Sequence, residues 1–248
     1  MEKYEFRNIQ TGDVHYLTID NIIRVIREQP DIEYLKIVNG VETKINNRIV
    51  CNTQFICHRI NTISELKNIP TMFGIELDLR DNNGDIIVTH DPFTSGESFC
   101  EYIQHYKHSH IILNIKSERI EPECLRLLDA YDIRNYFFLD SSFPMIYQLN
   151  QTFNNSNIAC RFSEYEPIEN YIHSHSFVKW VWVDCFNQQP LDECSYKVIQ
   201  NYGGKICIVS PELQSQPNKI IEYRDYFIQN EIVPNAICCK YYNIIHWI

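Results

Sequence analysis

Glycine is scarce in this chain, with 7 glycines in 248 residues against 23 asparagines. No glycine-rich loop follows the first apolar run, which argues against the phosphate loop of a dinucleotide-binding fold. The turns must instead use asparagine and aspartate, the non-glycine residues that best tolerate a left-handed backbone. No run of 18 apolar residues occurs either, so the sequence predicts no membrane span.

Positive charge is also in short supply, because 22 Lys and Arg stand against 32 Asp and Glu, for a formal net charge of −10. A nucleic-acid-binding face needs clustered Lys and Arg, so we expect no nucleic-acid partner. Anionic lipid headgroups repel an acidic surface, so we expect no stable membrane association. The first seven residues (MEKYEFR) alternate charged and apolar types and do not resemble a signal peptide.

Patterned cysteine pairs are missing, although the chain has 10 cysteines. No Cys-x-x-Cys pair occurs, and several cysteines lie inside apolar runs such as 206–209 (ICIV) and 237–239 (ICC). A zinc site or a disulfide framework would need closer, patterned spacing. Buried reduced thiols are the better interpretation, and they predict a cytoplasmic protein.

Short runs of β-branched and aromatic residues recur along the chain. There are eight of them: 54–58 (QFICH), 74–79 (GIELDL), 111–115 (IILNI), 136–139 (YFFL), 158–162 (IACRF), 179–183 (KWVWV), 205–209 (KICIV) and 236–239 (AICC). Most start 20 to 31 residues after the previous one, with helix-like stretches such as 121–132 and 218–230 between them. This rhythm predicts an α/β fold, a (β/α)8 TIM barrel over residues 51–248, with a doubly wound open sheet as the rival.

Two segments stand outside this rhythm. Residues 81–84 (DNNG) and the apolar stretch 85–89 predict a hairpin that protrudes from the barrel rim. Residues 1–50 predict a small α+β appendage, with hairpins around residues 11–13 and 39–40 and a short capped helix over 20–27. A lid, a separate module and a contact that makes a homo-oligomer all remain open as its role.

In a TIM barrel, the active site lies at the carboxyl ends of the strands. We therefore examined the polar residues at or just after each apolar run, which are His58, Arg59, Glu76, Asp78, His90, Asn114, Lys116, Arg161, Trp182, Asp184, Glu212 and Lys240. Glu76 and Asp78 share one strand face, where unpaired charge is costly because both faces of a barrel strand are covered. The last five residues of that set predict a substrate pocket.

Several of these features also have a purely structural interpretation. His58 alone could be a hydrogen-bonded core histidine, and Trp180 and Trp182 could be core packing rather than a substrate wall. Residues 105–110 (HYKHSH) bring three histidines together and could suggest a metal. We interpret them instead as a solvated helix end at the far, amino-terminal face of the barrel.

The segment from His58-Arg59-Ile60-Asn61-Thr62, through Gly74-Ile75-Glu76-Leu77-Asp78, to His90-Asp91-Pro92 resembles the glycerophosphodiester phosphodiesterase family, in the superfamily of phosphatidylinositol-specific phospholipase C-like barrels. The resemblance is specific over roughly residues 55–92 and looser to the C-terminus. It implies that Glu76, Asp78 and Asn114 ligate Mg²⁺ or Ca²⁺. It also implies that His58 and His90 act as general base and acid, and that Arg59 and Lys116 hold the phosphate.

The chain departs from the family pattern at three points. Ile60 stands where the family has a glycine, so the backbone there is less free to approach a phosphate. The segment from His58 to Glu76 is short, which predicts a reduced first helix. Asn114 stands where the family has an acidic ligand, so we expect weaker metal binding, or a ligand borrowed from Glu118, Asp184 or Glu212.

The leading hypothesis is therefore a metal-dependent phosphodiesterase acting on a small soluble diester such as a glycerol-phosphate or polyol-phosphate conjugate. The alternative is a catalytically silent barrel that binds a phosphorylated ligand or a partner protein. A sugar-phosphate isomerase ranks last, because the Gly203-Gly204 pair precedes the seventh predicted strand rather than following it. Because the site would gather Arg59, Lys116, Arg161 and Lys240, we expect a local reversal of the chain's negative charge there.

Overall fold

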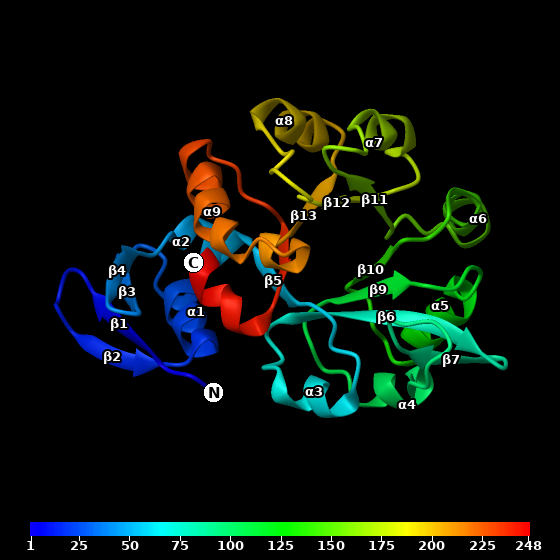
Figure 1. Cartoon of the computed structure of the whole chain (residues 1–248), viewed down its shortest axis with the longest axis horizontal. Coiled ribbons are helices and arrows are strands. Elements are labelled where there is room, and N and C mark those ends of the chain that lie inside the picture. Colours follow the sequence, from blue (N-terminus) through cyan, green and yellow to red (C-terminus); the bar gives the residue numbers. More distant parts are fainter.

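Eight parallel strands form a closed barrel in the computed structural model, which describes residues 1–248 (Figure 1). The strands are β5 (Gln54–Cys57), β6 (Gly74–Asn82), β9 (Ile111–Ile115), β10 (Tyr136–Leu139), β11 (Ala159–Phe162), β12 (Trp180–Val183), β13 (Lys205–Val209) and β14 (Ala236–Cys239). Neighbours in the sheet are neighbours in sequence, and β14 pairs back with β5. A parallel bridge between Phe138 and Ile158 joins β10 to β11 and completes the ring. The predicted TIM barrel is confirmed.

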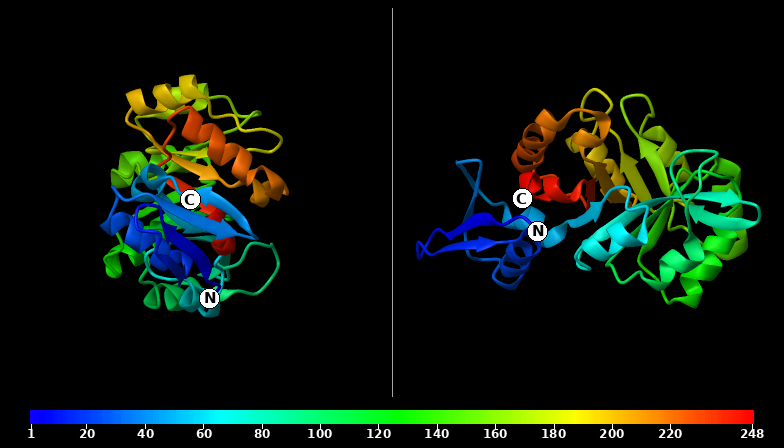
Figure 2. Two further views of the ribbon diagram at one scale, coloured as in Figure 1. Left: turned by 90° about the vertical axis from the view of Figure 1, so that its left-hand side faces the viewer. Right: turned by 60° about the horizontal axis from the view of Figure 1, so that its bottom comes forward.

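A helix follows each barrel strand and lies on the outside of the ring (Figures 1 and 2). These helices are α3 (Ile63–Asn68), α4 (Phe99–Gln104), α5 (Glu121–Ala130), α6 (Phe143–Phe153), α7 (Glu169–Ser174), α8 (Glu193–Asn201), α9 (Ile220–Gln229) and α10 (Ile244–Trp247). Short 3₁₀ turns, η1 (Pro211–Gln214), η2 (Pro217–Lys219) and η3 (Tyr241–Asn243), precede α9 and α10. Helix α3 has only six residues, as the short segment before Glu76 predicts.

Alternate residues of each strand point into the barrel or out toward the helices. The outward residues, such as Ile75, Leu77 and Leu79, belong to the large core shared with the helices. The inward residues form a separate apolar core: Ile56, Ile112, Phe137, Leu139, Ala159, Trp180, Trp182, Cys207, Val209, Ala236 and Cys238. This packed interior separates a polar cavity at the carboxyl ends of the strands from a second cavity at their amino ends.

The predicted rim hairpin is present. Strand β6 continues beyond the barrel to Asn82 and pairs antiparallel with β7 (Asp85–Val88), which pairs in turn with β8 (Glu97–Ser98). The turn uses left-handed Asn83 and Gly84. Left-handed backbone also occurs at Asn39, Asp132, Asp140 and Asn154, so asparagine and aspartate do replace glycine in several turns.

The N-terminal residues form an antiparallel sheet in the order β2-β1-β3-β4, which fits the predicted appendage. Its elements are β1 (Tyr4–Asn8), β2 (Val14–Leu17), α1 (Ile19–Glu28), β3 (Tyr34–Val38), β4 (Val41–Lys44) and α2 (Asn47–Asn52). Both predicted hairpins are present, and Asn39-Gly40 makes the turn between β3 and β4. Helix α1 begins one residue before Asp20, with Thr18 at the capping position but no side-chain cap, so the capped start over 20–27 is wrong in detail.

The appendage packs on the C-terminal segment, which lies between it and the barrel (Figures 1 and 2). The buried ammonium of Lys36 in β3 donates to the backbone carbonyls of Ile245 and Ile248. The indole of Trp247 donates to Ser210 Oγ at 2.8 Å, at the end of β13. One continuous hydrophobic core therefore runs from Phe6 in the appendage to the barrel.

All ten cysteines are free, and six are buried. Four of those six, Cys57, Cys207, Cys238 and Cys239, lie in barrel strands, so the interpretation as packed thiols is confirmed there. None of the helices has the length and apolarity needed to span a bilayer.

The histidines of residues 105–110 lie, as expected, just before β9 at the amino-terminal face of the barrel, and they form no metal cluster. The expectation of a solvated segment is wrong for two of them. His108 is buried and its Nε2 lies 2.9 Å from the carbonyl of Ile69. His110 packs between Phe137 and Trp180, with ring centroids 5.5 and 5.3 Å away.

His110 predicts a measurable pH dependence of stability. Burial, together with the nearby Lys205, lowers the pKa of His110 to about 4 from 6.5. Below pH 6.5 the histidine is protonated in the unfolded chain, whereas in the folded chain it stays neutral down to about pH 4. This residue therefore makes the free energy of unfolding decrease as the pH is lowered. Between pH 7 and pH 5, the unfolding free energy of the wild type should decrease by about 2 kcal/mol more than that of His110→Asn, as measured by urea denaturation. The same change at exposed His15 should leave the pH slope unaltered.

Candidate active site

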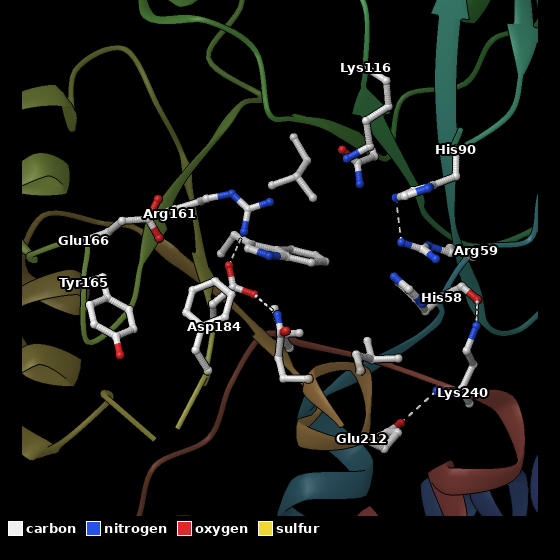
Figure 3. Close-up of a pocket in the computed structure, with 17 residues that line it drawn as sticks. His58, Arg59, His90, Lys116, Arg161, Tyr165, Glu166, Asp184, Glu212 and Lys240 are labelled. Carbon is white, nitrogen blue, oxygen red and sulfur yellow. Dashed lines mark hydrogen bonds and ion pairs between the residues drawn. The ribbon is translucent and has the colours of Figure 1, made fainter. Parts of the chain in front are cut away.

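Polar side chains line a cavity of about 650 Å³ at the carboxyl ends of the barrel strands (Figure 3). Ten of the twelve predicted site residues line it: His58, Arg59, His90, Asn114, Lys116, Arg161, Trp182, Asp184, Glu212 and Lys240. The other two, Glu76 and Asp78, lie on inward positions of β6 with no exposed surface. The structure thus brings the predicted residues together at one end of the barrel.

His58 follows β5 and is kept neutral by its surroundings. Burial lowers the pKa of His58 to about 3, and the cations Lys240 and Arg59 lower it further, against a small opposing effect of Asp78. Its Nε2 lies 3.8 Å from Glu76 Oε2, and its buried Nδ1 has no hydrogen-bond partner. A neutral imidazole with an unused ring nitrogen is able to accept a proton.

His90 is held by a neighbour on each side of its ring. Its Nδ1 lies 2.7 Å from Asp91 Oδ1, and its Nε2 lies 2.6 Å from an Nη of Arg59. Because a guanidinium can only donate, Nε2 accepts, and we therefore assign the ring proton to Nδ1, which donates to Asp91.

Arg59 adopts a left-handed backbone, with φ at 53°. This turns its N–H onto Glu76 Oε2 at 2.7 Å, while its Nε lies 3.8 Å from Asp78 Oδ2. The neighbouring Ile60 has an ordinary φ, is buried, and accepts a hydrogen bond from Tyr102 at its carbonyl. The position where the family has glycine therefore packs in the core and does not line the cavity.

The two buried carboxylates meet Asn114 at the floor of the cavity. Asp78 and Asn114 are direct partners in the register of β6 and β9, and Asn114 Nδ2 donates to Glu76 Oε1 at 2.9 Å. Asn61 closes the other side, donating from Nδ2 to Asp78 Oδ2 at 2.9 Å and accepting from the Asp78 N–H at 3.0 Å. Burial raises the pKa of both carboxyls, and for Asp78 the neighbouring Glu76 raises it further.

Two oxygens of this floor group have no hydrogen-bond donor, although both are buried. They are Asp78 Oδ1 and Asn114 Oδ1, and the nearest cation to the former is Lys116, with Nζ 3.7 Å away. Uncompensated carboxylate and amide oxygens beside a second carboxylate are a donor set that suits a hard divalent cation. The residues present therefore fit the implied Mg²⁺ or Ca²⁺, with one negative charge fewer than three acids would supply.

No third acid joins Glu76 and Asp78, since no cluster of three His, Cys, Asp or Glu side chains is placed to hold a metal. The three acids expected to lend a ligand have other partners. Glu118 accepts from Ser142, Asp184 from Arg161 and Gln214, and Glu212 from Ser210 and the Lys240 N–H. The expectation of a borrowed ligand is not met by this arrangement.

The opposite wall of the cavity is built around Arg161 (Figure 3). Its guanidinium lies between Asp140, with Nε to Oδ1 at 2.8 Å, and the buried Asp184. Asp140 also accepts from Lys116 Nζ at 3.1 Å, so alternating charges cross the floor from Asp78 through Lys116, Asp140 and Arg161 to Asp184. These interactions run between side chains from five different strands or strand ends.

Three of the four expected cations, Arg59, Lys116 and Arg161, lie within 4 Å of a carboxylate, whereas Lys240 Nζ donates to the carbonyl of His58 at 3.1 Å and makes no ion pair. The expected reversal of charge is therefore wrong for those three residues. The wall also presents residues that sequence reasoning left out of the predicted pocket: Asp140, Tyr165, Glu166, Phe186 and Gln214. Asp140 directly follows β10 and is one of the strand-end residues that the sequence indicates, although it is not among those assigned to the substrate pocket. Nothing in the local sequence distinguishes the other four from ordinary loop residues.

Comparison with known proteins identifies the fold of the chain but not its activity. No protein-family model matches the sequence, and no curated protein matches it. A glycerophosphodiester phosphodiesterase from Agrobacterium tumefaciens superposes with a TM-score of 0.54 and 13% identity, covering 75% of this chain and 96% of that one. A phosphodiesterase from Oleispira antarctica, solved with its product sn-glycerol-3-phosphate, superposes with a TM-score of 0.53 and 13% sequence identity. This match covers 75% of this chain and 92% of that one. The resemblance in the sequence around His58, Glu76 and His90 thus extends to the architecture, because the chain has the barrel fold of these glycerophosphodiester phosphodiesterases.

Proposed function

We propose that the chain is a phosphoric diester hydrolase that cleaves a small soluble glycerophosphodiester-like substrate with the help of a divalent metal. The observation that carries this proposal is the cavity itself. Two imidazoles and two cations face one space above a pair of fully buried carboxylates. A site that only binds an anion has little use for paired proton-transfer groups or for two buried acids.

The chain's own residues suit the two proton transfers of diester cleavage. His58 is neutral and takes the proton of the attacking hydroxyl, which comes from water or from a neighbouring hydroxyl of the substrate. Burial is the main cause of the lowered His58 pKa, and an entering anion opposes only the additional effect of Lys240 and Arg59. His90, once protonated at Nε2 with its Nδ1–H donating to Asp91, gives the Nε2 proton to the leaving alkoxide. Arg59 and Lys116 hold the phosphate oxygens.

Glu76, Asp78 and Asn114 are the residues that would hold the metal, because Asp78 and Asn114 each have an oxygen without a donor beside the buried Glu76 carboxylate. When bound, a Mg²⁺ or Ca²⁺ ion would add positive charge against the phosphate oxygens. The register of β6 and β9 fixes Asp78 opposite Asn114, and Asn61 fixes the rotamer of Asp78. The ligands are thus positioned by the fold before an ion arrives.

The cavity also supports a polar, soluble substrate. Glu166 and Gln214 line the wall opposite the histidines, beside the ion-paired Arg161, and their side-chain oxygens can accept hydrogen bonds from the hydroxyl groups of a glycerol or polyol. The structural neighbour from Oleispira was solved with sn-glycerol-3-phosphate, which supports the same substrate class here.

The direct test is release of glycerol phosphate from glycerophosphodiesters, measured with Mg²⁺, Ca²⁺ or Mn²⁺ and again in excess EDTA. We expect turnover with at least one ion and a loss of roughly tenfold or more on chelation. Equal rates in EDTA would contradict the metal, and no turnover on any diester would contradict the activity.

A second candidate, a silent barrel that binds a phosphorylated ligand, is favoured by one observation. Asn114 donates its amide to Glu76 and brings no charge to the metal floor. Calorimetry separates the two proposals, because binding of an ion and of a phosphate ester without turnover of any diester would support the silent barrel.

A further inference from the structure

A second polar cavity lies at the opposite end of the barrel from the histidines. It has a volume of about 370 Å³ and is lined by residues at or just before the amino ends of the strands: Gln54, Ser109, His110, Arg134, Asn135, Tyr136, Asn157, Lys179, Trp180, Lys205 and Asn235. Three of these are Lys or Arg and three are Asn, and none is Asp or Glu. In a chain with a net charge of −10, a cavity without an acid is unexpected.

Two lysines of this cavity have no counter-charge. Neither Lys179 nor Lys205 makes an ion pair, and neither ammonium has a hydrogen-bond acceptor, whereas Lys116 and Arg161 at the catalytic end are both paired. Lys205 Nζ lies 5.4 Å from the centre of the Trp180 ring. Burial and the repulsion of Lys179 both lower the pKa of Lys205. Lys179 is exposed and Lys205 is half-buried. An anion bound between these two like charges would relieve their repulsion.

Neutral hydrogen-bond donors complete the cavity. Asn235 Oδ1 accepts from the Ile206 N–H at 2.8 Å, so its amide Nδ2 remains free to donate. The side-chain amides of Asn135 and Asn157 carry no hydrogen bond within the chain, and the buried Nε2 of His110 has no partner. Arg134 is paired with Asp129 and Asp132 at the exposed rim and is not counted as a free charge.

We propose that this cavity binds a small phosphate-bearing anion, on the face of the barrel opposite the catalytic site. Two ammonium groups and the amides around them match the oxygens of one phosphate or diphosphate group. The volume suits a small molecule, and the acidic character of the whole chain opposes a long polyanion such as nucleic acid. The proposal is independent of the phosphodiesterase activity, because the packed barrel interior separates the two cavities.

Calorimetric titration with pyrophosphate, in the absence of metal ions, tests this site. The double variant Lys179→Gln/Lys205→Gln should bind at the far cavity about tenfold or more weakly than wild type. The change removes a repulsion along with the contact between Lys205 and Trp180, and a circular dichroism spectrum like that of wild type checks that the variant folds. Arg59→Gln should keep the far-cavity binding, and a charge-matched variant of exposed lysines, Lys3→Gln/Lys197→Gln, should bind like wild type.

Fluorescence reports which cavity is occupied. In Trp182→Phe the remaining indoles are Trp180, at the far cavity, and Trp247, which has no exposed surface. We expect pyrophosphate to change the emission of this variant, because it draws Lys205 away from the Trp180 ring, and we expect no change when Lys205→Gln is added. The proposal is overturned if the lysine variants bind pyrophosphate as wild type does, or if sodium chloride at equal ionic strength displaces it completely.

Discussion

Replacing His58 with alanine is expected to lower kcat/KM for a glycerophosphodiester by about 10³-fold, within the range that a positioned general base contributes. The neutral imidazole lines the cavity and has a ring nitrogen without a hydrogen-bond partner, whereas both oxygens of the Glu76 carboxylate already accept hydrogen bonds from Arg59 and Asn114. The loss should fall mainly on kcat, because Arg59 and Lys116 remain to bind the phosphate. Steady-state kinetics on the purified variant measures it.

The matched control is His15→Ala, because His15 is exposed on β2 of the appendage. That variant should keep wild-type kinetics, and both variants should retain the wild-type circular dichroism spectrum. His90→Ala should lose activity by a similar factor. A His58→Ala enzyme with at least half of the wild-type kcat/KM would remove His58 from the mechanism.

Replacing Asn114 with aspartate is expected to make stability depend strongly on a divalent ion. Without metal, the new carboxylate faces Glu76 Oε1 where an amide donated before, and three buried acids share the floor. We expect a loss of about 3 kcal/mol, or roughly 5–10 °C in Tm, in EDTA. With saturating Mg²⁺ or Ca²⁺ the variant should recover most of that loss, because the ion now meets a third charged ligand.

Thermal unfolding with and without the ion gives the answer, with Asn218→Asp on the exposed turn η2 as the charge-matched control. The control should respond to the ion as wild type does. If the Asn114→Asp protein melts at one temperature in EDTA, Mg²⁺ and Ca²⁺, then Glu76, Asp78 and residue 114 do not form a metal site.

The barrel could be predicted from the sequence because each strand is a local run of apolar residues with its own composition. The same alternation that places Ile56 inside the barrel places His58 inside it two residues later, so the site residues could be predicted from the strands that carry them. The rim hairpin could also be predicted, because Asn83-Gly84 is a local turn signal.

Pairing between side chains of different strands could not be predicted in the same way. Asp140 accepts hydrogen bonds from Lys116 and Arg161, which lie 24 and 21 residues away from it in the sequence. No local pattern shows which acid will lie beside which base, so four cations predicted to reverse the charge of the cavity instead have acids or carbonyls as partners. The burial of His108 and His110 was missed for a similar reason, because residues 105–110 look polar until distant segments cover them.

The contact between Lys36 and the carbonyls of Ile245 and Ile248 has a consequence for how the molecule assembles. The two ends of this contact are 209 and 212 residues apart in sequence. Closing a loop of that length is entropically unfavourable until the intervening barrel has brought its ends together. The N-terminal sheet is made first during synthesis, yet it gains this partner only after residue 245 has been added. Docking of the N-terminal sheet onto the C-terminal segment is therefore a late step of folding. Until then, the face of β3 that carries Lys36 stays uncovered in the nascent chain.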